Sequence, residues 1–90
     1  MFIHIGDDNV IQSREVVSII DYELYTNTTG IYQMIQGWKR QNKVTGPEEE
    51  AKSIMITADH IYFSSLSVAT LRKRTGILTT ISNLDDYSEE

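Results

Sequence analysis

The sequence predicts a small α+β domain, in which a small antiparallel β-sheet built from two hairpins and one further strand packs against one amphipathic helix and one short C-terminal helix. Short runs of β-branched and aromatic residues, separated by turn residues, predict the strands. One stretch repeats apolar residues at helical spacing and predicts the amphipathic helix. The chain has 90 residues, the size of one domain with a limited core, and oligomerisation commonly supplements such a core.

The first hairpin and a further strand are expected near the N-terminus. Phe2–Ile5 and Val10–Gln12 are short strand-like runs, and Gly6–Asn9 between them is a dense turn signal. Ser13–Glu15 then interrupts the apolar pattern. Val16–Ile20 is a β-branched run, which predicts a strand that is buried on at least one face.

The amphipathic helix is expected to follow a loop. Asp21–Thr29 is interpreted as that loop, and Thr28 or Thr29 is placed to cap the helix. Gly46-Pro47 is expected to stop this helical element. The helix carries one apolar stripe at positions i, i+3, i+4 and i+7, formed by Ile31, Met34, Ile35 and Trp38.

Charged residues flank the end of this helix. Lys39, Arg40 and Lys43 lie where cations suit the helix dipole. Glu48–Glu50 then predicts a solvated acidic link to the second hairpin.

The strongest pattern lies within Lys52–Arg74. Ser53–Thr57 and Ile61–Ser65 are strand-like, and a short polar link between them predicts a hairpin. Side chains alternate along a strand, so we expect Ile54 and Ile56 on one face and Met55 and Thr57 on the other. The short C-terminal helix is expected at Val68–Arg74, with Ser67 as its N-cap and Gly76 at its end.

The charge of the chain is distributed unevenly. The net charge is −5, but residues 1–76 hold all eight basic and nine of the thirteen acidic residues, which leaves −1. We expect residues 1–76 to form the domain and residues 77–90 to be an extension. Its end, Asp85–Glu90, is predicted to be a disordered acidic tail. A nearly neutral domain with local basic patches leaves nucleic-acid binding open.

Several functional classes lack support in the sequence. Cysteine is absent, so neither a disulfide framework nor a thiolate metal site is available. The start of the chain has no basic n-region and no long apolar h-region, so no signal peptide is expected. No apolar run approaches the roughly 20 residues of a membrane helix. We expect a cytoplasmic protein that does not contact membranes.

Catalytic and metal-binding patterns are also missing from the sequence. Asp7-Asp8-Asn9 lacks the ligand spacing of a cation loop and is interpreted as a turn. His4 and His60 have no second histidine nearby, so structural roles are expected for both. We therefore expect no enzymatic activity, no catalytic residue, no metal site and no cofactor.

An ordered set of segments resembles the bacterial extracellular matrix regulators of the RemA/RemB family. The segments are Phe2–Gly6, Asn9–Ile11, Arg14 with Val16–Ile20, Met34-Ile35 and Asp59–Ser64. Ile3–Asp8 and Ser67–Arg74 resemble the RemB-like branch more closely. The resemblance covers residues 2–74. It implies a small cytoplasmic protein that forms a closed homo-oligomeric ring, for example a heptamer, and that regulates matrix (biofilm) genes.

The resemblance also implies a DNA-binding surface. Arg14 matches a basic residue of that surface, although an interface salt bridge with Glu15 or Asp21 of a neighbour fits it equally. The other basic pair of the surface lies just before the second hairpin. This chain has Glu49, Glu50 and Lys52 there, and carboxylates repel phosphates.

Three further cations end the C-terminal helix. Arg72, Lys73 and Arg74 project over roughly 200° of helical arc, so helix-dipole stabilisation and phosphate contact both remain open. The candidate DNA-binding residues are thus Arg14, Lys52, Arg72, Lys73 and Arg74.

Two functions follow from these observations. The first is a ring-forming, DNA-binding transcriptional regulator of matrix genes, whose partner is double-stranded DNA. The alternative is a protein-interaction subunit that acts through another matrix regulator and does not contact DNA. The basic residues favour the first, and Glu48–Glu50 with the acidic tail favours the second.

Overall fold

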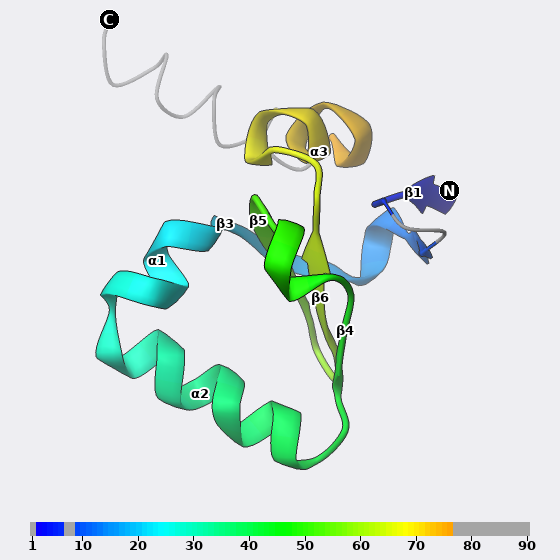
Figure 1. Ribbon diagram of the computed structural model, residues 1–90. Coiled ribbons are helices and arrows are strands. Elements are labelled where there is room, and N and C mark those ends of the chain that lie inside the picture. Colours follow the sequence, from blue (N-terminus) through cyan, green and yellow to red (C-terminus); the bar gives the residue numbers. More distant parts are fainter. Residues whose placement is uncertain (1, 7–8, 77–90) are drawn as a thin grey trace, which may run out of the picture.

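The structure is a computed structural model that describes residues 2–6 and 9–76, and it has the predicted α+β class (Figure 1). Nine strands and helices follow one another along the described chain: β1 (Phe2–His4), β2 (Val10–Gln12), β3 (Val16–Asp21), α1 (Tyr22–Asn27), α2 (Thr29–Arg40), β4 (Val44–Thr45), β5 (Ser53–Thr57), β6 (Ile61–Ser64) and α3 (Val68–Thr75). The described chain also contains two 3₁₀ turns, η1 (Ser13–Glu15) and η2 (Glu48–Glu50). The predicted extension, residues 77–90, lies outside the described residues.

The strands form two sheets. β1 and β2 make a two-stranded antiparallel sheet, and the larger sheet has the order β3-β5-β6-β4. β5 pairs antiparallel with both neighbours, from Asp21↔Ser53 to Val16↔Thr57 on one side and through Met55↔Tyr62 on the other. β4 runs parallel to β6. The prediction of a single antiparallel sheet built from both hairpins is therefore wrong. The first hairpin forms a sheet of its own, and a two-residue strand after α2 adds a parallel edge that no sequence pattern indicates.

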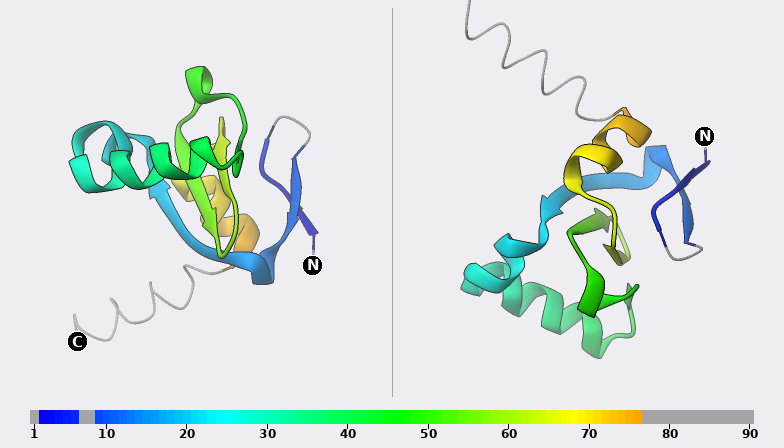
Figure 2. Two further views of the ribbon diagram at one scale, coloured as in Figure 1. Left: turned by 90° about the horizontal axis from the view of Figure 1, so that it is seen from below. Right: turned by 45° about the horizontal axis from the view of Figure 1, so that its top comes forward.

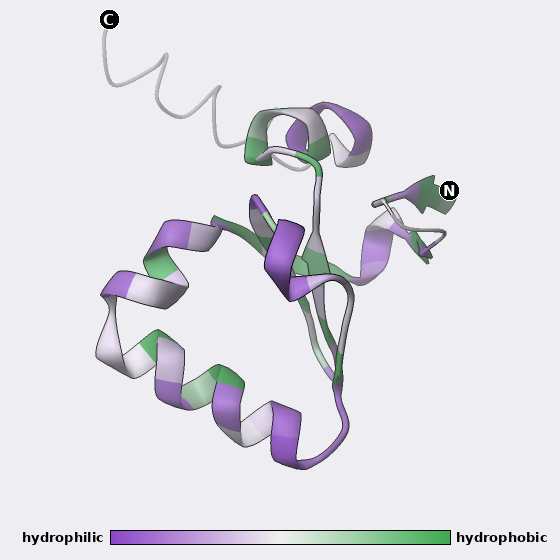
Figure 3. Cartoon of the chain, viewed as in Figure 1, coloured by the Kyte–Doolittle hydropathy of each residue, from purple (hydrophilic) through white to green (hydrophobic). Residues whose placement is uncertain are grey.

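β5 divides the hydrophobic core in two. Met55 belongs to a first buried cluster with Ile3, Ile5, Ile11 and Leu71, which joins the N-terminal hairpin to α3. Ile54 belongs to a second cluster under α1 and α2, together with Tyr25, Ile35, Ile61 and Phe63. The predicted alternation along this strand is confirmed. Figure 3 shows hydrophobic residues gathered on the central strands, with hydrophilic residues on the turns and on much of the helices around them.

The segment before α2 is helical, so the prediction of a loop at Asp21–Thr29 is wrong. Asp21 caps α1, because its side chain accepts a hydrogen bond of 2.9 Å from the Glu23 N–H. The helix buries Tyr25, which packs against Phe63. Thr28 holds the N-cap position of α2 as expected, although its side chain makes no capping bond.

α2 packs through a narrower stripe than predicted. Ile35 is fully buried, and Ile31 and Trp38 are partly buried against the second cluster. Met34 is 39% exposed, because it lies on the flank of the helix that turns away from the sheet. None of the helices within residues 2–6 and 9–76 is long and apolar enough to cross a membrane.

The predicted second hairpin and C-terminal helix are confirmed. Ser67 accepts a hydrogen bond from the Thr70 N–H and caps α3. Gly76 ends that helix in the left-handed conformation, with φ 73°. Figure 2 shows α3 and the N-terminal hairpin on one side of the larger sheet, with α1 and α2 away from them.

Replacing Gly46 by alanine is expected to destabilise the domain. Gly46 has φ +116°, and an added Cβ would lie 2.2 Å from the Phe63 carbonyl oxygen on β6. Strain of this kind costs about 1–3 kcal/mol of unfolding free energy, measurable by urea unfolding. Gly30→Ala is the matched control, because Gly30 lies in α2 with nothing within 4 Å of its added Cβ. It should preserve stability or raise it by up to about 1 kcal/mol. Equal stability of the two variants would contradict this account of the turn.

Candidate nucleic-acid interface

The structure does not gather all five predicted DNA-binding residues in one place. Arg14 lies in η1, directly before β3, and β3 begins beside the last residue of β5, Thr57. Lys52 precedes the first residue of β5, Ser53. The five-residue length of β5 therefore separates them, which is about 13 Å at roughly 3.3 Å per residue.

The other four predicted residues lie at one end of the molecule. η1 directly precedes β3, against which α3 packs, and both views of Figure 2 draw this light-blue turn next to the orange C-terminal end of α3. Arg74 links α3 to the N-terminal hairpin, because its Nη1 donates a 2.9 Å hydrogen bond to the His4 carbonyl on β1. All four side chains are exposed. We call this group the basic end: Arg14, Arg72, Lys73 and Arg74.

The cations of the basic end have no carboxylate partner in the part of the chain that the structure describes. The ion pair that the described residues contain joins Lys39 to Glu48, and both of these residues lie outside the group of Arg14 and the α3 cations. Arg74 is engaged with a backbone carbonyl. Arg14, Arg72 and Lys73 remain available to an external anion, and the position of the last two near the α3 C-terminus also suits the helix dipole.

A second charged surface lies across the molecule. In the left view of Figure 2, η2 and η1 are at opposite sides of the larger sheet. Tyr22, Pro47, Glu48, Glu49 and Glu50 line an open hollow of about 640 Å³ there. Among the residues described, Glu49 and Glu50 have no cationic partner. We call this surface the acidic end: Glu49, Glu50 and the hollow beside them.

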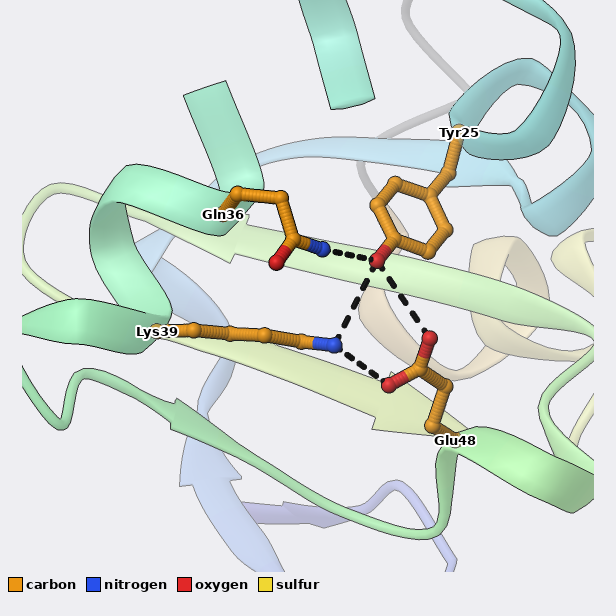
Figure 4. A network of polar contacts seen from close by, with 4 residues as sticks. All are labelled: Tyr25, Gln36, Lys39 and Glu48. Carbon is orange, nitrogen blue, oxygen red and sulfur yellow. Dashed lines mark hydrogen bonds and ion pairs between the residues drawn. The ribbon is translucent and has the colours of Figure 1, made fainter. Parts of the chain in front are cut away.

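A polar network holds η2 in place (Figure 4). Lys39 Nζ lies 2.5 Å from Glu48 Oε1, and the Tyr25 hydroxyl donates to Glu48 Oε2 at 3.3 Å. Gln36 Nε2 donates to the same hydroxyl at 2.7 Å. The Tyr25 ring is buried in the second core cluster, so the network anchors the acidic turn to the core. The predicted solvated link describes Glu49 and Glu50, whereas Glu48 is only partly exposed, at 38% of its side chain, and is engaged in this network. Tyr25 was not predicted to take part, because its segment was assigned to a loop.

Burial and pairing shift two pKa values in this network. Burial disfavours the Lys39 ammonium, but its bonds to Glu48 and Tyr25 outweigh burial and raise its pKa. Burial raises the pKa of the Tyr22 hydroxyl, and the negative charge of Glu48 adds to the effect. Lys39 is thus charged and Tyr22 neutral around neutral pH, which leaves Glu49 and Glu50 as the unpaired charges of η2.

Residues 2–6 and 9–76 contain no group of three or more histidine, aspartate or glutamate side chains that could hold a metal ion. The His60 ring has a structural environment, since its Nε2 lies 2.6 Å from Thr45 Oγ1 and the ring packs against Tyr62. Asp7 and Asp8 lie outside the described residues.

Comparison with known proteins gives two concordant similarities. Residues 2–75 match the family described as "RemA-like: Extracellular matrix regulatory protein A-like". The chain is 34% identical over 83 residues to "Extracellular matrix regulatory protein B" of Bacillus subtilis (strain 168). That alignment covers 92% of this chain and 100% of the relative.

Removing the Tyr25 hydroxyl should loosen η2. Tyr25→Phe keeps the buried ring but deletes the atom that joins Gln36, Lys39 and Glu48. We expect the unfolding free energy to fall by about 1 kcal/mol in urea titrations. Tyr32→Phe is the control, because Tyr32 is 48% exposed and outside the network, and it should change stability little. An unchanged Tyr25→Phe protein would show that the network does not stabilise the fold.

The same network predicts a loss of stability at alkaline pH. The folded pKa of Lys39 is raised above its ordinary 10.5, so its contribution is fully present below that value and is lost as the pH rises through the folded pKa. Tyr22, also raised, acts in the same direction. Melting temperatures should therefore decline from about pH 10 upward. Lys39→Met should be less stable at neutral pH and decline less steeply, and parallel curves for the two proteins would contradict this role.

Proposed function

The chain belongs to the RemA-like family of extracellular matrix regulatory proteins, and we propose that it is a non-enzymatic, DNA-binding transcriptional regulator of matrix genes. In this proposal it acts in the cytoplasm as a homo-oligomeric ring and contributes to biofilm regulation. The observation that carries DNA contact is the basic end, where Arg14, Arg72 and Lys73 are exposed together and lack a described carboxylate partner.

These cations suit the phosphate backbone of DNA. Lys and Arg contacts to phosphates position a protein on the duplex and release counterions, which gives salt-dependent affinity with little sequence information. Arg72 and Lys73 are the preferred contacts, because they end an exposed helix. Arg74 is less suited, since its guanidinium already bonds to His4. Lys52 is less suited too, because it lies beside η2 rather than at the basic end.

Oligomerisation compensates for the small number of phosphate contacts that one subunit can make. One basic end offers few phosphate contacts, but copies joined in a ring bind the same duplex through effective concentration, so total affinity rises steeply. Each subunit repeats the surface at the rim. Binding therefore depends on assembly as well as on charge.

The acidic end supports a second candidate function. Glu49 and Glu50 have no described cationic partner, and two unpaired carboxylates repel phosphates. This favours a subunit that regulates matrix genes through another regulator protein and does not contact DNA. The two functions differ in one measurable property, the affinity for double-stranded DNA.

Fluorescence anisotropy with a labelled duplex tests the proposal. Arg72→Ala/Lys73→Ala should weaken binding by about tenfold or more and reduce the slope of log K against log salt by about two. The matched control is Arg40→Ala/Lys43→Ala, which removes the same charge from exposed positions at the far end of α2. That control should retain most of the affinity.

Three outcomes separate the possibilities. Selective loss in the Arg72/Lys73 variant supports DNA contact through the basic end. Equal losses in both double variants indicate general charge attraction and contradict the assigned surface. If the wild-type chain binds no duplex even at low salt, the DNA-binding proposal fails and the protein-interaction function takes its place.

A further inference from the structure

The N-terminal hairpin has one face without a partner. Phe2↔Gln12 and His4↔Val10 are cross-strand pairs, so Phe2 and Val10 share a face, whereas Ile3 and Ile11 point into the first core cluster. Phe2 is 69% exposed and Val10 44%. His4 and Gln12 share this face, so it presents two exposed apolar side chains among polar ones. A two-stranded sheet is marginal alone, and exposed apolar side chains on its outer face favour a covering partner.

Cations border this apolar face. η1 follows β2 directly and carries Arg14, and Arg74 ties β1 to the end of α3. The hairpin face and the basic end therefore form one continuous surface at one end of the molecule. Its partner should offer carboxylates around a recess that accepts an apolar side chain.

The acidic end of the same chain meets both requirements. Its hollow has the Tyr22 ring and Pro47 among its lining residues, and Glu49 and Glu50 border it. The Glu48 network fixes the turn, so these carboxylates are presented without ordering a mobile loop. The two surfaces lie at opposite ends of β5, so within one chain they do not meet.

We propose that the hairpin face and Arg14 of one copy dock head to tail on the acidic end of a second copy. Phe2 enters the hollow beside Tyr22, and Arg14 pairs with Glu49 and Glu50. This inference rests on the proposed ring and names the contact that closes it. Two different surfaces joined in this way form a heterologous interface, which generates a ring when the rotation closes.

The contact also leaves charge for DNA. Each junction sets two unpaired carboxylates, Glu49 and Glu50, against Arg14 of the neighbour, while Arg72 and Lys73 lie on the helix end beside it. Arg14 thereby offsets one of the two negative charges that would repel phosphate, and the contact turns the other toward the neighbouring subunit. The remaining cations recur once per subunit around the rim.

Light scattering after size exclusion tests the contact on the full chain. The acid-reversed variant is Glu49→Arg/Glu50→Arg, and the base-reversed variant is Arg14→Glu. Each should fall from the wild-type ring mass toward the 10.3 kDa of one chain. The swapped variant, with all three changes in one chain, should restore the ring. Arg40→Glu/Lys43→Glu is the control and should remain a ring, because those exposed cations lie outside the proposed contact.

The outcomes distinguish this inference from the proposed function. A ring that survives in the acid-reversed variant, or a swapped variant that fails to reassemble while circular dichroism shows it folded, overturns the head-to-tail contact and leaves the ring standing. A wild-type chain that is monomeric at micromolar concentration overturns the ring and this inference together. Both of these results are measurements of mass, so they do not depend on the DNA affinity of the Arg72→Ala/Lys73→Ala variant, which is measured separately.

Discussion

The pairing of β5 on both of its edges is the constraint on which the rest of the structure depends. The strand is almost wholly buried, so its backbone groups must be satisfied by neighbouring strands, and β3 and β6 supply those bonds. Its two faces then serve two separate core clusters, through Met55 on one side and Ile54 on the other. The N-terminal hairpin, α3, α1 and α2 are each held because they cover one of these faces.

That central strand also separates the charges. η1 lies near one end of β5 and η2 leads into the other, so Arg14 and the carboxylates of Glu49 and Glu50 lie at opposite ends of the strand. Residues 1–76 have a net charge of only −1, yet the fold keeps these charges apart, while Glu15 stays beside Arg14 and Lys52 beside η2. Composition alone conceals this property, because it arises from topology and not from the number of charges.

Sequence patterns predicted the elements whose stability is local. The β-branched runs of β3, β5 and β6, the Ser67 cap and the Gly76 end of α3 all follow from side-chain shape and backbone chemistry. α1 was missed because its six residues are poor in helix formers and are stabilised by burying Tyr25. β4 was missed because two residues cannot show a period. The placement of Arg14 at the same end of the molecule as the α3 cations was likewise not predictable, since it depends on how α3 packs on β3, a contact between segments far apart in the sequence.

The three consecutive glutamates of η2 show why charge at a site must be weighed after pairing. Glu48 is neutralised by Lys39 and tied to a buried tyrosine, so it acts as a structural anchor. Its neighbours carry the same charge without a described partner, and only they contribute to the outward potential. An acidic turn of this kind opposes phosphate when it is exposed. A second copy that brings an arginine to it favours assembly where the attraction between the two charges exceeds the cost of desolvating them. In the proposed ring the acidic turn faces Arg14 of a neighbour and Arg72 and Lys73 are left to contact phosphate, so this proposal assigns assembly and DNA contact to different charges of the same chain.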